Sequence, residues 1–206
     1  MTNRASKLLL MSATLLAGAA VLAQEHAPKP PPTQSEMKKL FNDNTAQAKL
    51  PADVHAALSA FVGEFTTQSE ARVVPPPAEP MRAHAHTSGK WIMGDLFVQV
   101  NAAADPDEEL KGQRQIIYGY DPAAKKYTMW QIESGQYTAT SAVGDYDAAT
   151  RTFTFEGERT MGALGKIGIL WTIAVQEDGA LKQAIKLKAA AGAAVEFVTV
   201  THTKVK

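Results

Sequence analysis

The chain has 206 residues, and its 21 basic residues balance its 21 acidic residues at pH 7. A chain without a large basic excess is not expected to bind nucleic acid through the phosphates. The sequence also contains no cysteine, which excludes a disulfide framework, thiol catalysis and zinc sites built on thiolates.

Residues 1–23 predict a secretory signal peptide. Arg4 and Lys7 precede an apolar run from Leu8 to Ala23, which ends in the compact side chains that a signal peptidase reads. Cleavage after Ala23 makes Gln24 the first mature residue. The run is shorter than the ~20 apolar residues that span a bilayer, and no comparable run follows it. The mature chain is therefore expected to be soluble, without a transmembrane segment, and exported to the periplasm or the exterior.

A proline-rich tether and a short helix are predicted next. Residues 24–32 are rich in proline, with Ala27 to Pro32 consisting of proline, one alanine and one lysine, a composition typical of an extended, solvated spacer. Thr33 followed by Glu36 has the spacing of a capping box, in which each residue bonds the other's backbone N–H. We therefore expect a helix over 34–45, so that residues 33–50 form a short helix and a linker.

The domain proper is predicted to begin at Pro51, which suits the first turn of a second helix ending near Gly63. Beyond Gly63 the apolar residues recur at every second position, which indicates strands. The predicted strands cover residues 64–74, 83–92, 95–102, 111–120, 126–133, 136–146, 151–158, 167–177, 180–189 and 194–205. Short polar connections between them favour an antiparallel meander.

The alternation is clearest near the C-terminus. Leu181, Gln183, Ile185 and Leu187 alternate there with Lys182, Ala184, Lys186 and Lys188. One face of each strand is therefore core and the other meets water, and closing such a sheet removes both of its edges. The sequence predicts a mainly β fold over residues 51–206, an antiparallel up-and-down barrel of about ten strands with one or two short N-terminal helices. A barrel of eight to ten strands is wide enough to hold one small ligand.

Several segments carry a resemblance to a known family. They are Leu58-x-x-Phe61-Val62-Gly63-Glu64-Phe65, Trp91 to Phe97, Ile117 to Pro122 with Lys126, Tyr127 and Trp130, and Gly144. On these residues, over 52–160, the chain resembles the bacterial domain-of-unknown-function family 1579. The resemblance implies a lipocalin-like barrel but no established activity and no catalytic residue. Gly63-Glu64-Phe65 is also similar to the Gly-x-Trp that opens the first strand of lipocalins, where the ring plugs the closed end beneath a basic residue.

His84 and His86 are the candidate metal ligands. Two residues apart on a predicted strand, they point to the same side, as two imidazoles must to share a metal. His202 or Glu70 could supply a third ligand, and haem bound through one histidine is a further alternative. The alternative is that Ala83, Ala85 and Thr87 face the core, so that both histidines face solvent. No motif such as His-Glu-x-x-His accompanies the pair.

Aromatic residues are the candidate walls of a ligand cavity. Trp91, Phe97, Tyr118 and Trp130 are the residues that we expect to line it, although such residues are more often core. The Pro-rich segment 74–80, between the first two predicted strands, is interpreted either as a lid over the barrel or as a rigid surface turn.

Three functions remain open from the sequence. The leading hypothesis is non-catalytic binding of a small apolar or amphipathic ligand inside the barrel. The second is an enzyme, or a metal or haem site, that uses His84 and His86. The third is a structural or interaction module of the cell envelope whose barrel is filled. The sequence names no cofactor, no ligand identity and no oligomeric state.

Overall fold

The structure is a computed structural model that describes residues 32–72, 79–108, 111–136, 138–160, 165–188 and 194–205. The predicted signal peptide, and the tether except for Pro32, lie outside these residues. The chain divides after Gln47 into two compact units.

The first unit contains the helix α2, Gln34–Gln47, which confirms the short helix predicted over 34–45. Its N-terminus is held by the predicted capping box. The Thr33 backbone N–H donates to Glu36 Oε2 at 2.7 Å, and the Glu36 N–H donates to Thr33 Oγ1 at 3.3 Å. These bonds satisfy backbone donors that have no partner within the helix.

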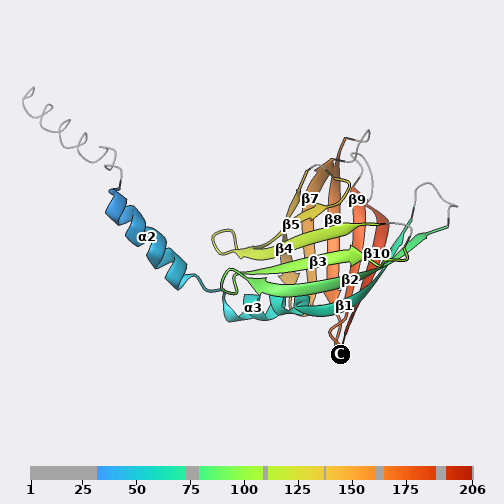
Figure 1. The fold of residues 1–206 in the computed structure, drawn as a ribbon, viewed down its shortest axis with the longest axis horizontal. Coiled ribbons are helices and arrows are strands. Elements are labelled where there is room, and N and C mark those ends of the chain that lie inside the picture. Colours follow the sequence, from blue (N-terminus) through green and yellow to red (C-terminus); the bar gives the residue numbers. More distant parts are fainter. Residues whose placement is uncertain are drawn as a thin grey trace, which may run out of the picture. The chain divides into compact units, whose positions relative to one another are not determined.

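The second unit is a closed antiparallel barrel of ten strands, as predicted (Figure 1). The strands are β1 Gly63–Ala71, β2 Met81–Ile92, β3 Phe97–Ala104, β4 Gln113–Asp121, β5 Lys126–Glu133, β6 Thr140–Asp147, β7 Thr152–Thr160, β8 Lys166–Val175, β9 Leu181–Lys188 and β10 Val195–Lys204. Each strand pairs with its neighbour in sequence, and β1 pairs with β10 to close the barrel. At this seam Phe65 lies opposite Lys204, and Thr67 lies opposite His202.

The largest difference from the predicted strands is at β6, which begins at Thr140 rather than at residue 136. Gln136 belongs to the preceding turn, because its backbone N–H donates to the carbonyl oxygen of Glu133 at 3.2 Å. Gly135 adopts a φ of 81° in the same turn, a conformation that glycine takes readily and that ends the preceding strand.

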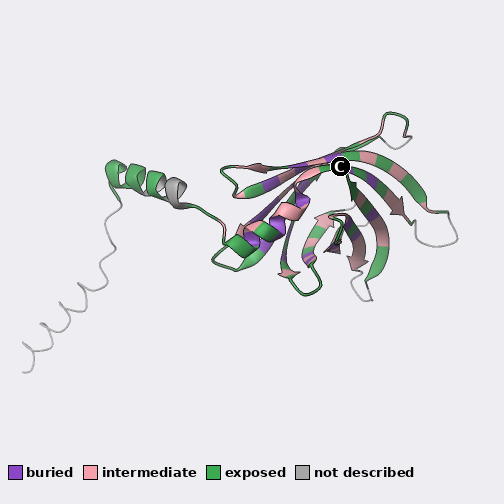
Figure 2. Ribbon diagram, turned by 90° about the horizontal axis from the view of Figure 1, so that it is seen from below, coloured by how far each residue is buried: buried purple, intermediate pink, exposed green. Residues whose placement is uncertain are grey.

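One end of the barrel is filled by aromatic side chains beneath a helix. The helix α3, Ala52–Leu58, and the 3₁₀-helix η1, Ser59–Phe61, pack on this end, which we call the helix end. The Phe61 ring stacks on the Tyr118 ring with centroids 4.0 Å apart. The side chains of Phe65, Phe153, Phe155 and Trp171 are each at most 1 % exposed. Figure 2 shows how buried residues alternate with exposed ones along the strands around this core.

Phe65 lies beneath a basic residue, as in the lipocalin arrangement to which Gly63-Glu64-Phe65 is similar. Lys204 Nζ lies 5.9 Å from the centroid of the Phe65 ring. Gly63 makes this approach possible, since its φ is 128° and a Cβ there would lie 3.1 Å from Lys204 Cε. The Phe65 ring and the Lys204 ammonium therefore close the seam between β1 and β10 at the helix end.

Gly89 on β2 lies close against the backbone of η1. A Cβ at Gly89 would overlap the carbonyl oxygen of Phe61, which is backbone and cannot rotate away. We expect Gly89→Ala to lower the free energy of unfolding by roughly 1–3 kcal/mol, which corresponds to several degrees in Tm. The control is Gly112→Ala, whose Cβ meets only Ser134 Oγ at 3.7 Å. Equal melting temperatures for the two variants in thermal denaturation would contradict this packing.

Candidate functional site

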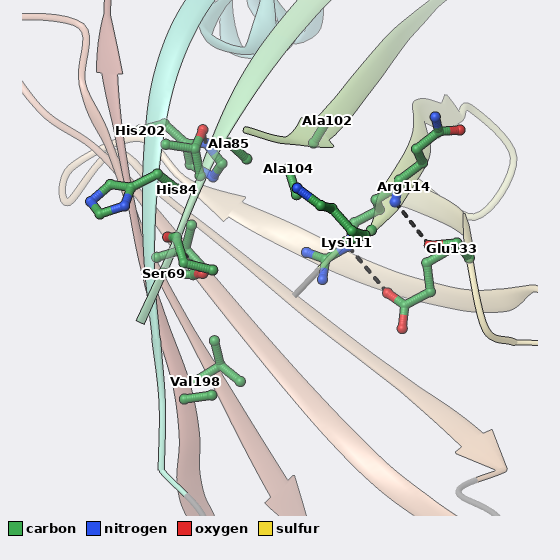
Figure 3. Close-up of a pocket in the computed structure, with 17 residues that line it drawn as sticks. Ser69, His84, Ala85, Ala102, Ala104, Lys111, Arg114, Glu133, Val198 and His202 are labelled. Carbon is green, nitrogen blue, oxygen red and sulfur yellow. Dashed lines mark hydrogen bonds and ion pairs between the residues drawn. The ribbon is translucent and has the colours of Figure 1, made fainter. Parts of the chain in front are cut away.

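The interior of the barrel is lined by small side chains at the end opposite to the helix end. The inward positions there include Ser69, Ala71, Ala83, Ala85, Ala102, Ala104, Val198 and Val200. They surround a cavity of about 330 Å³ (Figure 3), which we call the cavity. The space exists because the inward positions that carry aromatic rings at the helix end carry mostly alanine here.

Three polar side chains from β1, β2 and β10 form a hydrogen-bonded row inside the barrel. Thr67 Oγ1 lies 2.8 Å from Thr87 Oγ1 and 2.8 Å from His202 Nδ1. Thr67 and Thr87 are both buried. Burial, and secondarily the positive charge of Arg114, lowers the pKa of His202 to about 4. The imidazole is therefore neutral at neutral pH.

A charged cluster lies across the interior from this row. Arg114 Nε donates to Glu133 Oε2 at 3.1 Å, as Figure 3 shows. Arg159 Nη2 donates to the other carboxylate oxygen of Glu133. Gln131 Nε2 also donates to Glu133 Oε2, at 2.8 Å. One carboxylate from β5 thus accepts hydrogen bonds from two guanidinium groups, one on β4 and one on β7.

A smaller space of about 30 Å³ lies deeper in the barrel, and we call it the niche. It shares Ala102, Arg114 and His202 with the cavity, and Gln183 and Tyr118 also line it. Gln183 is 5 % exposed, and within the described part of the chain its Nε2 has no hydrogen-bond acceptor. Burial raises the pKa of the Tyr118 hydroxyl, which therefore remains protonated. The niche is large enough for a water molecule or a small polar group.

The predicted histidine pair lies on the outer face of the barrel. His84 Nδ1 is 2.7 Å from Glu108 Oε1, and His86 Nε2 is 2.8 Å from Glu64 Oε2. Both histidines are exposed, while Thr87 is buried in the opposite phase of β2. In Figure 3 the ring of His84 points away from Arg114 and Glu133. The arrangement matches the alternative in which both imidazoles face solvent.

The expected third metal ligands do not join this pair. His202 faces the interior, hydrogen-bonded to Thr67, and Glu70 forms ion pairs with Arg72 and Arg82. Among the residues that the structure describes, no three metal-ligating side chains of the His, Cys, Asp or Glu type come together.

Of the four predicted aromatic residues, only Tyr118 borders the interior space. Trp91 stacks on the His55 ring of α3 with centroids 4.3 Å apart, at the helix end. Phe97 and Trp130 are 36 % and 41 % exposed. Phe97 precedes the buried Val98, and Trp130 follows the buried Met129. Because neighbouring residues of a strand point to opposite faces, both rings point outward. The prediction that Trp91, Phe97 and Trp130 line the cavity is corrected accordingly.

The sequence analysis did not predict Arg114, Arg159 and Gln183 as residues of the site. Each one occupies an inward position of its strand, and Arg114 is in phase with the buried Ile116 and Tyr118. A charged or amide side chain at one of the alternate positions of a strand that are otherwise apolar is the signal that could have identified them. The Pro-rich segment 74–80 lies mostly outside the described residues, so its role as a lid remains a prediction.

Comparison with known proteins identifies a family. Residues 50–204 match the family model described as Protein of unknown function (DUF1579). A comparison with curated proteins finds no match. Within the described residues, no helix has the length and apolar character needed to cross a membrane.

The buried imidazole of His202 predicts a pH-dependent stability. An unfolded chain protonates this histidine near pH 6.5, whereas the folded chain does so near 4, so stability is lost as the pH falls through this window. The loss amounts to about 2 kcal/mol at pH 5 relative to neutral pH. We expect His202→Asn to remove this component of the loss, and the outward His84→Asn to retain it. Urea denaturation between pH 7 and pH 5 measures the difference, and identical pH profiles for wild type and His202→Asn would contradict it.

Proposed function

Because the chain belongs to the DUF1579 family of proteins of unknown function, we propose its function from the barrel itself: non-catalytic binding of one small, partly apolar molecule in the cavity. The observation that carries this proposal is the volume of about 330 Å³ inside the barrel. Ligand sites of proteins commonly begin at about this size, and they combine apolar walls with a few polar groups that orient the ligand.

The distribution of side-chain sizes supports a binding cavity over a filled barrel. A barrel with only a structural role gains stability by filling its interior at native density. Here the helix end is filled in this way, whereas the walls of the cavity consist largely of alanine. Each inward alanine in place of a larger apolar residue gives up burial free energy of roughly 1–3 kcal/mol. Retaining several of them together is the pattern expected when the space itself has a use.

The geometry of the histidines favours binding over the enzymatic hypothesis built on them. That hypothesis required His84 and His86 to converge on a pocket. Their rings instead lie outside the barrel against Glu108 and Glu64. Arg114, Glu133 and His202 border the cavity and are suited to orienting a bound molecule, and Lys111 and His84 also contribute to its lining.

Residues 1–23, which lie outside the described residues, support a proposal for the compartment in which binding takes place. The positive residues, the apolar run and the compact residues before Gln24 support export through a cleaved signal peptide. The cavity would then meet ligands of the periplasm or the exterior.

Export predicts the mass of the mature chain. Intact-mass measurement on protein isolated from the envelope fraction of its own cells is expected to give a chain that begins at Gln24. Substituting Leu15 and Leu16 with Arg interrupts the apolar run and is expected to keep the full-length chain in the cytoplasm. A full-length mass in the envelope fraction of the wild type would contradict cleavage.

Filling the cavity is expected to abolish binding. Ala104 faces the cavity, and Ala103 on the same strand is exposed on the opposite face. We expect Ala104→Phe to weaken binding of the neutral fluorescent probe N-phenyl-1-naphthylamine by about tenfold or more, and Ala103→Phe to leave it unchanged. Fluorescence titration measures both affinities. The absence of saturable binding to the wild type, or equal effects of the two substitutions, would contradict binding inside the barrel.

A further inference from the structure

We infer that the ligand of the cavity is an amphipathic carboxylate whose headgroup is bound by Arg114 and Gln183 and whose apolar part lies against the alanine wall. This inference rests on the proposed function and specifies the chemical class of its ligand. It follows from the charges, the hydrogen-bond donors and the apolar surfaces of the interior, taken in turn.

The charged cluster carries one positive charge in excess. Arg114 and Arg159 share the single carboxylate of Glu133. Arg159 and Glu133 are enclosed, with side chains 17 % and 18 % exposed, and the neighbouring His202 is neutral at neutral pH. An unbalanced charge inside a barrel is unfavourable unless a counter-charge approaches it. A monoanion supplies that counter-charge, whereas a cation would add to the excess.

The hydrogen-bond donors also exceed the acceptors. Nε is the donor of Arg114 that contacts Glu133, and within the described residues no acceptor is bonded to its two Nη groups. Gln183 Nε2 is a buried donor without an acceptor in the described part of the chain, whereas the Arg114 side chain is 36 % exposed. Both residues line the niche. A buried donor without an acceptor is unfavourable, and the two oxygens of a carboxylate can accept from both residues.

A guanidinium group also selects the shape of the anion. Its parallel N–H groups match the two oxygens of a planar carboxylate, which gives a charge-assisted, bidentate pair. The niche, at about 30 Å³, has room for a headgroup of few atoms.

The apolar part of the ligand is assigned to the larger space. Ala83, Ala85, Ala104, Val198 and Val200 line the cavity but not the niche. A molecule with its carboxylate at Arg114 therefore has an apolar wall beside the rest of its length. A short aliphatic or aromatic carboxylic acid has this combination of a compact anion and an apolar body.

A set of ligands of equal chain length tests the inference on the full mature chain. Octanoate, 1-octanol and octylammonium are each used to displace N-phenyl-1-naphthylamine. For the wild type we expect octanoate to bind about tenfold to a hundredfold more tightly than 1-octanol, as charge-assisted bonds predict, and octylammonium to bind least.

Four variants locate the preference within the interior. Arg114→Gln is expected to bring the affinity for octanoate down to that of the same variant for 1-octanol, and Arg114→Lys is expected to retain part of the preference. The outward Lys182→Gln removes the same net charge from the exposed face of β9 and is expected to retain all of it. Gln183→Leu removes the unpaired donor, so it is expected to weaken octanoate binding and to raise the Tm of the unliganded protein by a few degrees.

The outcomes separate this inference from the proposed function. If N-phenyl-1-naphthylamine binds but octanoate and 1-octanol displace it equally well from the wild type, the carboxylate inference is wrong and ligand binding stands. If Lys182→Gln abolishes the preference as fully as Arg114→Gln, the preference reflects net charge and the assignment to Arg114 is wrong. If the probe itself does not bind, the proposed function fails and the inference fails with it.

Discussion

The pairing of β1 with β10 is the interaction on which the rest of this structure depends, because it turns a meander into a closed surface with an inside. Once the seam is formed, every second residue of each strand faces an enclosed interior. The volume of those side chains then determines whether the interior is filled or contains a cavity. The seam also contributes directly to the site, since Thr67 on β1 and His202 on β10 face each other across it and hydrogen-bond at 2.8 Å.

The interior changes along the length of the barrel from a filled core to an open space. At the helix end Phe61, Phe65, Phe153, Phe155 and Trp171 form a dense core beneath α3 and η1. At the other end alanines surround a space bordered by Arg114, Glu133 and His202. The aromatic core supplies much of the burial that stabilises the fold. It therefore allows the opposite end to carry enclosed charge and the Gln183 amide, whose Nε2 has no acceptor among the described residues, although both lower the stability of the fold.

The fold could be predicted from the sequence because alternation is a local signal. Period-two alternation and short polar connections located all ten strands, and the Thr33–Glu36 spacing located α2. The site could not be predicted in the same way. The prediction that Trp130 and Phe97 line the interior is wrong, because both rings face outward. The aromatic character of a residue does not indicate on which face of a strand its side chain lies. The contact of Arg114 and Arg159 with Glu133 joins side chains from three strands, β4, β5 and β7, and no short motif encodes it. The outer ion pairs of His84 and His86 likewise depend on Glu108 and Glu64, which lie on other segments.

The seam between the first and last strands also determines when the molecule can acquire its tertiary structure. Thr67 and His202 are 135 positions apart in the chain, so closure must wait until nearly the whole polypeptide has left the ribosome. Contacts of such long range make folding slow, and β1 keeps an unpaired edge throughout this interval. The topology that encloses the cavity therefore also lengthens the time during which the newly made chain remains unfolded, which is the state that the proposed export would need.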